Sequence, residues 1–331
     1  MSEHFYIRDI KGIKSNQELS QKSLDVLSDI KALSTINAYE SDWNDFCDWC
    51  KYKKVSFFPA TPETIVNYIN DLADYAKTST IRRRISAISE NFNSAGLSAS
   101  NPCRDWLVRE TLIGLTRIKG AAQKGKTPVY WDELRAMIGC MDLKTLAGVR
   151  DKAILLTGFM GAFRRSEIAG LNAEDIARLP QGIIISVTRS KTDQEQKGQQ
   201  VAIPYISDKT MCAITALNAW VQQAHISSGP LFRSILKNGK VSERRLSDKT
   251  INLLVKKYAS LIGLNPDLYG AHSLRHGFAT YAALHGVEER LIMKQTRHRS
   301  VEMVRHYINE ADLFSNNAIS LIFGNPQSTN K

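Results

Sequence analysis

Hydrophobic residues in the first 120 positions recur every three or four residues, which is the spacing of one face of a helix. The segment 61–76 shows the pattern clearly, because Thr61 supplies an N-cap and Pro62 takes the first helical position. Its apolar face consists of Ile65, Tyr68, Ile69 and Leu72. The same spacing predicts further helices over 16–31, 35–53, 78–95 and 101–119. The beginning of the chain is therefore expected to be all-helical.

The pattern changes after residue 131, where helices alternate with two β-branched runs. The runs "GIIISVTR" (182–189) and "QQVAIP" (199–204) predict two strands, joined by the charged loop "SKTDQEQKG". Helices are expected over 131–141, 146–162, 208–223, 247–261, 273–285 and 287–296. The fold class that follows is mostly α: an all-helical N-terminal domain, then a mixed α/β domain with a small antiparallel sheet.

Domain boundaries follow from these elements and from one polar segment. Residues 121–131, "AAQKGKTPVYW", are small, basic and polar, which is typical of a linker. We predict an N-terminal extension at 1–33, a helical domain at 34–120, the linker at 121–131, a second domain at 132–312, and a C-terminal helix and tail at 313–331.

Charge is the compositional feature that narrows the function. The net charge of +11 and the pI near 9.4 favour an anionic partner, nucleic acid first. Residues 1–76 carry a net charge of −4, whereas residues 77–124 carry +6, so the positive charge begins at the helix "KTSTIRRRISAISENF". A merely solvated basic face is the alternative. The sequence contains no membrane-spanning apolar run and "MSEHFYIRDIKGIK" has no signal core, so we expect a cytoplasmic, nucleoid-associated protein with no membrane partner.

The five cysteines do not predict a metal or redox site. Cys47 and Cys50 have the C-x-x-C spacing, but no second Cys/His pair completes four ligands. They lie on an aromatic helical stretch and are expected to be core-facing thiols.

Basic residues stand at the edges of four separate elements of the second domain. They are Arg164, Lys191, His272, Arg275 and His298. Each has a structural explanation when taken alone: a snorkelling arginine paired with Glu167, a polar loop lysine, helix capping, or simple surface. A phosphodiester explains them together, because guanidiniums grip its oxygens in bidentate fashion and imidazoles donate to them or move protons.

The chemistry of cleavage then needs a nucleophile. No cluster of Asp and Glu has a spacing suited to Mg²⁺, so we predict neither a metal site nor a cofactor. Cleavage without a metal calls for a covalent nucleophile, and "VRHYINEAD" offers Tyr307 downstream of His298.

The order of these motifs resembles the tyrosine recombinase, or phage integrase, family. The matching features are Arg-x-Ser-Glu in "FRRSEIAGL", a hairpin lysine, His-x-x-Arg in "HSLRHGFATY", and a His and a Tyr nine residues apart. The match covers about 34–323, since the first domain is similar to the family's core-binding domain. Two departures stand out: "TRH" replaces the frequent Leu-Gly-His, and the Thr often found before the tyrosine is absent.

The resemblance implies a role for each matched residue. Arg164 and Arg275 would clamp the scissile phosphate, and Lys191 would protonate the 5′-oxygen. His272 would act as general base, and His298 as a second phosphate donor. Tyr307 would form a 3′-phosphotyrosine without metal or ATP, and Glu167 would orient the clamp. His276 is expected to make a structural hydrogen bond.

The resemblance also implies partners and leaves alternatives open. The expected partner is double-stranded DNA with inverted-repeat half-sites, bound by a homotetramer that joins two sites and exchanges its C-terminal helices between protomers. Only about 33 residues precede the first family-like helix, so a simpler recombinase of the Cre or Xer type is expected. Topoisomerase-like relaxation or hairpin formation, a degenerate integrase that only binds DNA, and a metal-dependent nuclease remain alternatives.

The basic face of the 78–95 helix suits the major groove, but at most two of its three successive arginines can face a duplex. The residues expected to contact DNA are Lys77, Arg82, Arg83, Arg84, Arg117, Lys119, Lys124, Arg244, Arg245 and Lys249.

Overall fold

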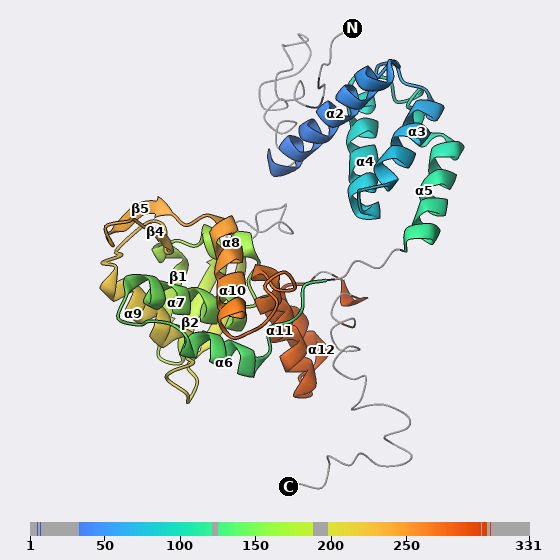
Figure 1. Cartoon of the computed structure of the whole chain (residues 1–331). Helices are drawn as coiled ribbons and strands as arrows, with labels where there is room; N and C mark the ends of the chain where they lie inside the picture. The colour runs from blue at the N-terminus through green and yellow to red at the C-terminus, as the bar shows by residue number, and fades with distance from the viewer. Residues whose placement is uncertain are drawn as a thin grey trace, which may run out of the picture. The chain divides into compact units, whose positions relative to one another are not determined.

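The chain divides into two compact units, residues 1–124 and 125–331 (Figure 1). The computed structural model describes residues 5, 7, 33–120, 125–187, 198–298, 300–302 and 305. Each unit has its own hydrophobic core. The fold is mostly helical, as predicted, and no described helix combines the length and apolarity that a membrane crossing requires.

The first unit is built from helices. Four of the predicted ones are confirmed, although a 3₁₀ turn, η2, precedes the last because Asp105 caps a new helix start. The predicted helix over 16–31 lies outside the described residues. The elements are α2 (Leu33–Lys53), α3 (Pro62–Ala73), α4 (Thr78–Ser94), η2 (Pro102–Arg104) and α5 (Trp106–Lys119).

Aromatic rings fill the core of this unit. Trp43 and Phe46 of α2 are fully buried, and Phe92 of α4 packs edge-on against Trp43 at 6.4 Å between ring centroids. Cys47 and Cys50 are buried in the same cluster, which confirms them as core-facing thiols. Burial raises the pKa of the Cys50 thiol to about 12, so the thiolate needed for metal or redox chemistry is disfavoured.

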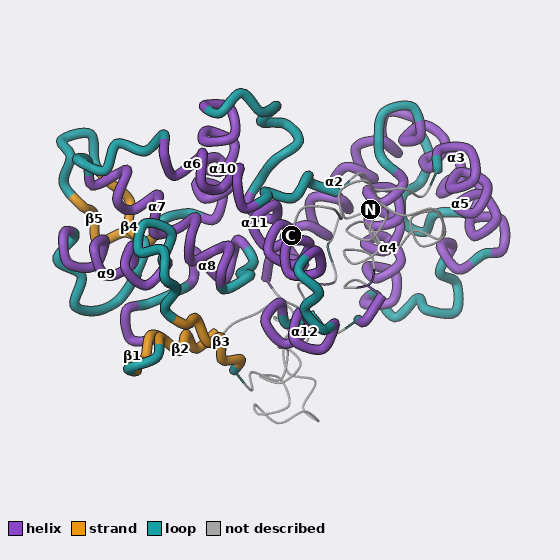
Figure 2. The backbone as a smooth tube through the Cα atoms, turned by 90° about the horizontal axis from the view of Figure 1, so that it is seen from below, coloured by secondary structure: helices purple, strands orange, loops and turns teal. Residues whose placement is uncertain are grey.

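The second unit contains a three-stranded and a two-stranded sheet, which lie beside its helices (Figure 2). Its elements are α6 (Trp131–Gly139), α7 (Leu146–Met160), α8 (Arg165–Gly170), η3 (Ala173–Asp175), β1 (Ile176–Leu179), β2 (Gly182–Val187), β3 (Gln199–Pro204), α9 (Ala213–Gln223), β4 (Arg233–Ile235), β5 (Val241–Arg245), α10 (Asp248–Leu261), α11 (Ala271–Leu284) and α12 (Glu289–Thr296).

The three-stranded sheet contains the predicted hairpin. Strands β2 and β3 pair antiparallel, with Ile183 opposite Ile203 and Ile185 opposite Val201 on the buried face. The sequence pattern did not predict β1, β4 or β5. Strand β1 buries only its first residue, and β4 and β5 bury none, so none of them shows an alternation of buried and exposed positions.

Two predicted helices begin or end elsewhere. Helix α9 begins at Ala213 rather than near 208, because Asp208 accepts the backbone N–H groups of Thr210 and Met211 in a separate turn. Helix α7 ends at Met160, and Ala162 then adopts a left-handed backbone (φ 45°). Arg164 and Arg165 therefore do not interrupt a helix; they begin the next one, α8.

The second half of the expected linker packs against the second unit. Val129 is fully buried, and its backbone N–H donates to the Ser273 carbonyl at 3.0 Å. A Cβ atom at Gly277 would approach the Val129 carbonyl oxygen to 1.9 Å, so only glycine allows this contact. The His276 ring contacts the Lys126 carbonyl oxygen at 2.9 Å, which confirms its structural hydrogen bond. These contacts fix the first turns of α11.

Candidate active site

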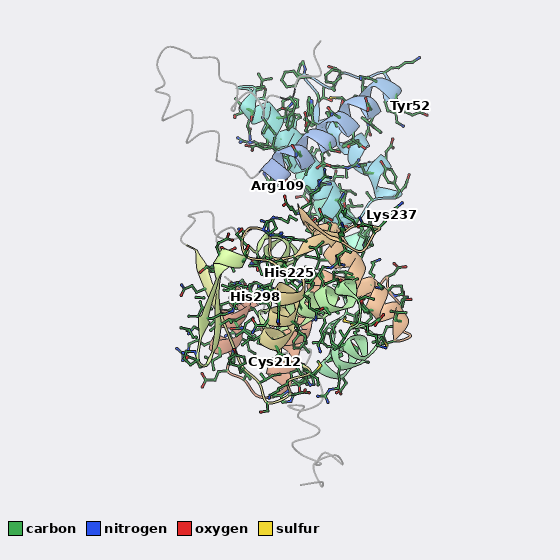
Figure 3. All side chains as sticks on the ribbon, turned by 90° about the vertical axis from the view of Figure 1, so that its left-hand side faces the viewer. Tyr52, Arg109, Cys212, His225, Lys237 and His298 are labelled. Atoms are coloured by element: carbon green, nitrogen blue, oxygen red, sulfur yellow. The ribbon has the colours of Figure 1, made fainter. Side chains whose placement is uncertain are left out.

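The matched residues come from three places in the second unit that are far apart in the sequence. Arg164 and Glu167 lie at the start of α8, His272 and Arg275 at the start of α11, and His298 just after α12. The Ala162 carbonyl, in the turn between α7 and α8, accepts from side chains of both other segments. Figure 3 labels His298 among the elements of this unit. The structure therefore brings these residues together.

Arg164 is tied to Glu167 at the start of α8. The Glu167 carboxylate accepts the Arg164 backbone N–H at 2.8 Å and its Nη1 at 2.7 Å. The glutamate side chain is fully buried, whereas the arginine side chain is 21% exposed. The predicted contact is confirmed, and one edge of a positive guanidinium stays open to solvent.

Arg275 is buried more deeply, on the first turn of α11. Its side chain is among the largest fully buried ones of the described chain, and its Nη1 donates to the Ala162 carbonyl at 2.7 Å. The helix N-terminus adds a further positive potential beside it. A guanidinium at this depth keeps a full positive charge close to the other arginines of the site, which suits an anionic ligand.

Arg297 is a third arginine of the site, and sequence reasoning missed its place there. Its Nη2 donates to Glu167 Oε2 at 2.7 Å, so two arginines share one buried carboxylate. Burial raises the pKa of Glu167, but the charge of Arg297 and the hydrogen bonds from Arg164 outweigh burial and lower it. The only sign of this role in the sequence was the unusual triplet "TRH", which places Arg297 directly before His298.

Both histidines are held neutral. His272 is accessible to solvent, but protein atoms around the ring desolvate it. That desolvation, with the charges of Arg275 and Arg164, lowers the pKa of His272 to about 4. Desolvation and then the same two arginines lower the pKa of His298 to about 3. Neutral imidazoles can accept protons, whereas imidazoliums cannot.

The tautomer of His298 follows from its neighbour. The buried Thr296 hydroxyl donates its one proton to the Ile292 carbonyl at 2.7 Å. The 2.8 Å contact between Thr296 Oγ1 and His298 Nδ1 is therefore a bond that the ring N–H donates. Nε2 of the neutral ring is then the acceptor nitrogen.

Two candidate residues, Lys191 and Tyr307, lie outside the described residues, as does Lys124. Within the described part of the chain, no group of three His, Cys, Asp or Glu residues could hold a metal ion.

The three arginines of α4 have different surroundings. Arg84 is ion-paired with Asp45 and donates to the Tyr68 hydroxyl at 3.1 Å, so it is part of the helix packing. Arg83 pairs with Asp42 at 3.1 Å but stays 45% exposed. Arg82 is exposed and donates to the Thr116 hydroxyl at 2.9 Å; among the described residues, no carboxylate pairs with it.

The other predicted DNA contacts divide in the same way. Lys119 donates to the Ala73 and Ala76 carbonyls at the end of α3, and Arg245 to the Ala169 and Leu171 carbonyls. Both side chains are exposed all the same. Exposure is shared by the other four described residues of this group, Lys77, Arg117, Arg244 and Lys249, so all six DNA contacts stay predictions.

Comparison with known proteins agrees with the fold and the motifs. Residues 129–313 match the phage integrase family, and residues 12–95 match the phage integrase N-terminal SAM-like domain. An integrase/recombinase xerD homolog of Selenomonas ruminantium is 45% identical over 312 residues, covering 94% of this chain and 92% of that protein. The tyrosine recombinase XerC of Thermodesulfovibrio yellowstonii is 28% identical, covering 74% of this chain and 76% of that protein.

Solved structures show the same fold at low identity. A XerH site-specific recombinase bound to palindromic difH substrate, in a post-cleavage complex, has a TM-score of 0.67 at 16% identity, covering 97% of this chain and 94% of that one. A lambda integrase tetramer bound to a Holliday junction has a TM-score of 0.54 at 14% identity, covering 91% and 76%.

Fold and site together define a DNA strand-exchange enzyme of the tyrosine recombinase class. The chain belongs to the phage integrase family, with Xer-like relatives, and it is a site-specific recombinase that binds, cleaves and rejoins DNA.

Proposed function

We propose that the second unit cleaves DNA at a single phosphodiester held by Arg164 and Arg275, with Tyr307 as nucleophile. The observation that supports this most directly is the convergence of two arginines and two neutral imidazoles around the Ala162 carbonyl and Glu167. Their combined positive charge suits the extra negative charge of a pentacoordinate phosphate, which is where preorganised donors lower a barrier.

The protonation states suit the proposed roles. A neutral His272 acts as the general base for the tyrosine hydroxyl, because its pKa near 4 leaves it unprotonated at pH 7. His298 starts as an acceptor at Nε2. An incoming phosphate supplies the opposite charge that favours the protonated ring, and His298 then donates to a phosphate oxygen.

Cleavage then proceeds by exchange of one ester for another. Tyr307 attacks phosphorus, forming a 3′-phosphotyrosine, and the 5′-oxygen leaves with a proton from Lys191. The phosphodiester energy is retained in the tyrosyl linkage, so a 5′-hydroxyl from a partner strand can reverse the step without ATP. Acting on DNA, the protein would work in the cytoplasm at the nucleoid.

A suicide substrate tests the nucleophile. A nick a few nucleotides 3′ of the scissile phosphate lets the short strand with the freed 5′-hydroxyl diffuse away, so the covalent adduct accumulates and migrates slowly on a denaturing gel. Tyr307→Phe should bind DNA normally and form no adduct, because only the phenolic oxygen is lost. Tyr205→Phe is the matched control, since Tyr205 is an exposed tyrosine of the same unit. Undiminished adduct with Tyr307→Phe would refute the assignment.

Two-site exchange separates the proposed outcome from its alternatives. A recombinase should exchange flanking DNA between two inverted-repeat sites, each holding two protomers. Relaxation of a supercoiled circle with one site would indicate topoisomerase-like action instead. Binding without any cleavage would indicate a degenerate integrase, and cleavage that gives no adduct and stops in EDTA would indicate a metal-dependent nuclease.

We also propose that four protomers assemble by exchanging the C-terminal segment 313–323, "LFSNNAISLIF". An apolar groove of the second unit provides a surface for it, lined by Trp131, Phe159, Phe278, Tyr281, Leu291 and Ile292. Leu291 is 46% exposed there, so an apolar segment of a second copy would cover it. A contact of this head-to-tail kind closes into a ring.

Truncation and a groove variant test this assembly. Removing residues from 313 onward, or changing Leu291→Asp, should leave a protein that binds one half-site without cooperativity and does not recombine. Leu253→Asp is the control, because Leu253 is an exposed leucine of α10 outside the groove. If the segment instead docks on its own chain, truncation would lower the melting temperature of the monomer at every concentration and leave cooperative binding intact.

A further inference from the structure

Arg297 has a backbone conformation that an arginine seldom adopts. It follows the last turn of α12 with φ 56° and ψ 41°, in the left-handed region that glycine enters freely. For other L-residues this conformation is strained, because Cβ comes too close to the following carbonyl oxygen. Its backbone N–H still closes the helix by donating to the Met293 carbonyl at 2.7 Å. The cost indicates that the side chain contributes something that glycine could not.

The side chain of Arg297 links α12 to the turn between α7 and α8. It is only 4% exposed. Nη1 donates to the Gly161 carbonyl at 3.0 Å and to the Gln295 carbonyl at 2.8 Å, while Nη2 donates to the Ala162 carbonyl at 3.1 Å. The guanidinium carbon lies 4.9 Å from the centre of the Phe163 ring, within range of a cation–π contact.

Its acceptors are those of the two clamping arginines. Glu167 accepts from both Arg297 and Arg164, through Oε2 and Oε1 respectively. The Ala162 carbonyl accepts from both Arg297 and Arg275. A buried residue that contacts the support of each clamp residue can set the spacing between them.

Sharing one carboxylate also affects the charge that the clamp presents. Glu167 alone would neutralise Arg164 completely. Because Arg297 shares the same carboxylate, the two arginines and Glu167 together keep one net positive charge. The Arg164 side chain, which is 21% exposed, can present that charge to a ligand.

We propose that Arg297 is a positioning residue of the cleavage reaction: it fixes Glu167 and the Ala162 carbonyl, and through them the separation and charge of Arg164 and Arg275. It does not touch the phosphate itself. This inference rests on the proposed clamp roles of those two arginines.

Three substitutions separate the contributions of Arg297. Arg297→Met keeps much of the packing volume and removes the charge and hydrogen bonds. Arg297→Gly also relieves the backbone. Arg297→Lys keeps the charge but loses the planar fork that reaches several acceptors. Each variant is compared in the full-length protein by the single-turnover rate of adduct formation, the Kd for a half-site, and the melting temperature.

The expected result is a loss of rate without a matching loss of affinity. A displacement of catalytic groups by about 1 Å costs on the order of 100-fold in rate. We therefore expect Arg297→Met and Arg297→Gly to form adduct about 100-fold more slowly, with Kd changed less than about threefold, because phosphate contacts elsewhere supply most of the affinity. Arg297→Lys should recover part of the rate.

A buried arginine away from the site provides the matched control. Arg150 is 7% exposed and donates to Asp151 and to the Arg233 carbonyl. Arg150→Met should lower the melting temperature but leave the rate per folded molecule unchanged. The proposal is overturned if folded Arg297→Met and Arg297→Gly cleave at the wild-type rate, or if their rates fall only in proportion to the folded fraction, as with Arg150→Met. Arg164→Ala tests the clamp separately: normal cleavage there would refute the proposed function instead.

Discussion

Replacing Glu167 with glutamine removes the negative charge that Arg164 and Arg297 share and keeps the shape of the side chain. The carboxylate is fully buried and accepts the Arg164 backbone N–H, Arg164 Nη1 and Arg297 Nη2, all within 2.8 Å. A glutamine has only one acceptor oxygen, so its amide N–H₂ would face a donor. Hydrogen bonds to charged groups contribute about 1.5–3 kcal/mol each, and breaking a buried ion pair costs about 3–5 kcal/mol. We expect Glu167→Gln to lower the free energy of unfolding of this unit by about 3–5 kcal/mol.

The pH dependence of this loss follows from the pKa of Glu167. Burial acts to raise that pKa, but Arg297 and Arg164 together lower it below its usual value. A group with a depressed pKa in the folded state stabilises the protein above its unfolded pKa, about 4.3, and loses that contribution as the pH falls through the folded value. The difference between wild type and Glu167→Gln should therefore be complete at pH 7 and shrink below about pH 4.

Calorimetry and denaturant unfolding at pH 7 and below measure the effect. Glu174→Gln is the control, because Glu174 also accepts a backbone N–H, from Gly229 at 2.8 Å, but does so at the surface. It should change stability little. Binding of half-site DNA should reduce the stability lost in Glu167→Gln, since a phosphate gives the arginines another anion. A loss below about 1 kcal/mol, which is the range of exposed pairs, or an equal loss in both variants, would refute the reasoning.

Further outcomes test the acid, the DNA contacts and the histidine tautomer. Lys191→Ala should cleave slowly on ordinary DNA and recover on a substrate with a 5′-thiol leaving group, which needs no proton; if the thiol restores nothing, the lysine is not the general acid. Arg82→Ala should weaken binding to all sites and lower the salt slope by about one, whereas Arg84→Ala should mainly lower the melting temperature, because Arg84 holds Asp45 and Tyr68. Equal effects of the two on the salt slope would contradict this division. Thr296→Val should reduce the adduct rate about tenfold by freeing the His298 ring, which is less than the roughly 100-fold or more lost with a whole proton-transfer group, and Thr296→Ser should not reduce it. An unchanged rate in the valine variant would show that Thr296 does not control the tautomer.

The sequence alone determined the fold class, the family and most of the helices. Helical periodicity and capping are local, so α3 could be predicted from Thr61, Pro62 and its apolar face. The family followed from short motifs, because Arg164 with Glu167 and His272 with Arg275 are each neighbours on one turn. The roles of these residues remain predictions. Strand β1 was missed because a strand that buries only its first residue shows no alternation of apolar and polar positions.

Only the tertiary structure decided which basic residues contact other parts of the fold and which stay exposed. Arg84 and Arg82 have the same surroundings in the sequence "TIRRRIS". In the structure Arg84 forms an ion pair with Asp45 of another helix, whereas Arg82 is exposed. Arg297 lies 130 residues from Glu167, and no periodicity relates them. Such pairings depend on how α12 packs beside the α7–α8 turn. A pattern along the chain records which face of an element is buried, and it does not record which distant partner that face meets.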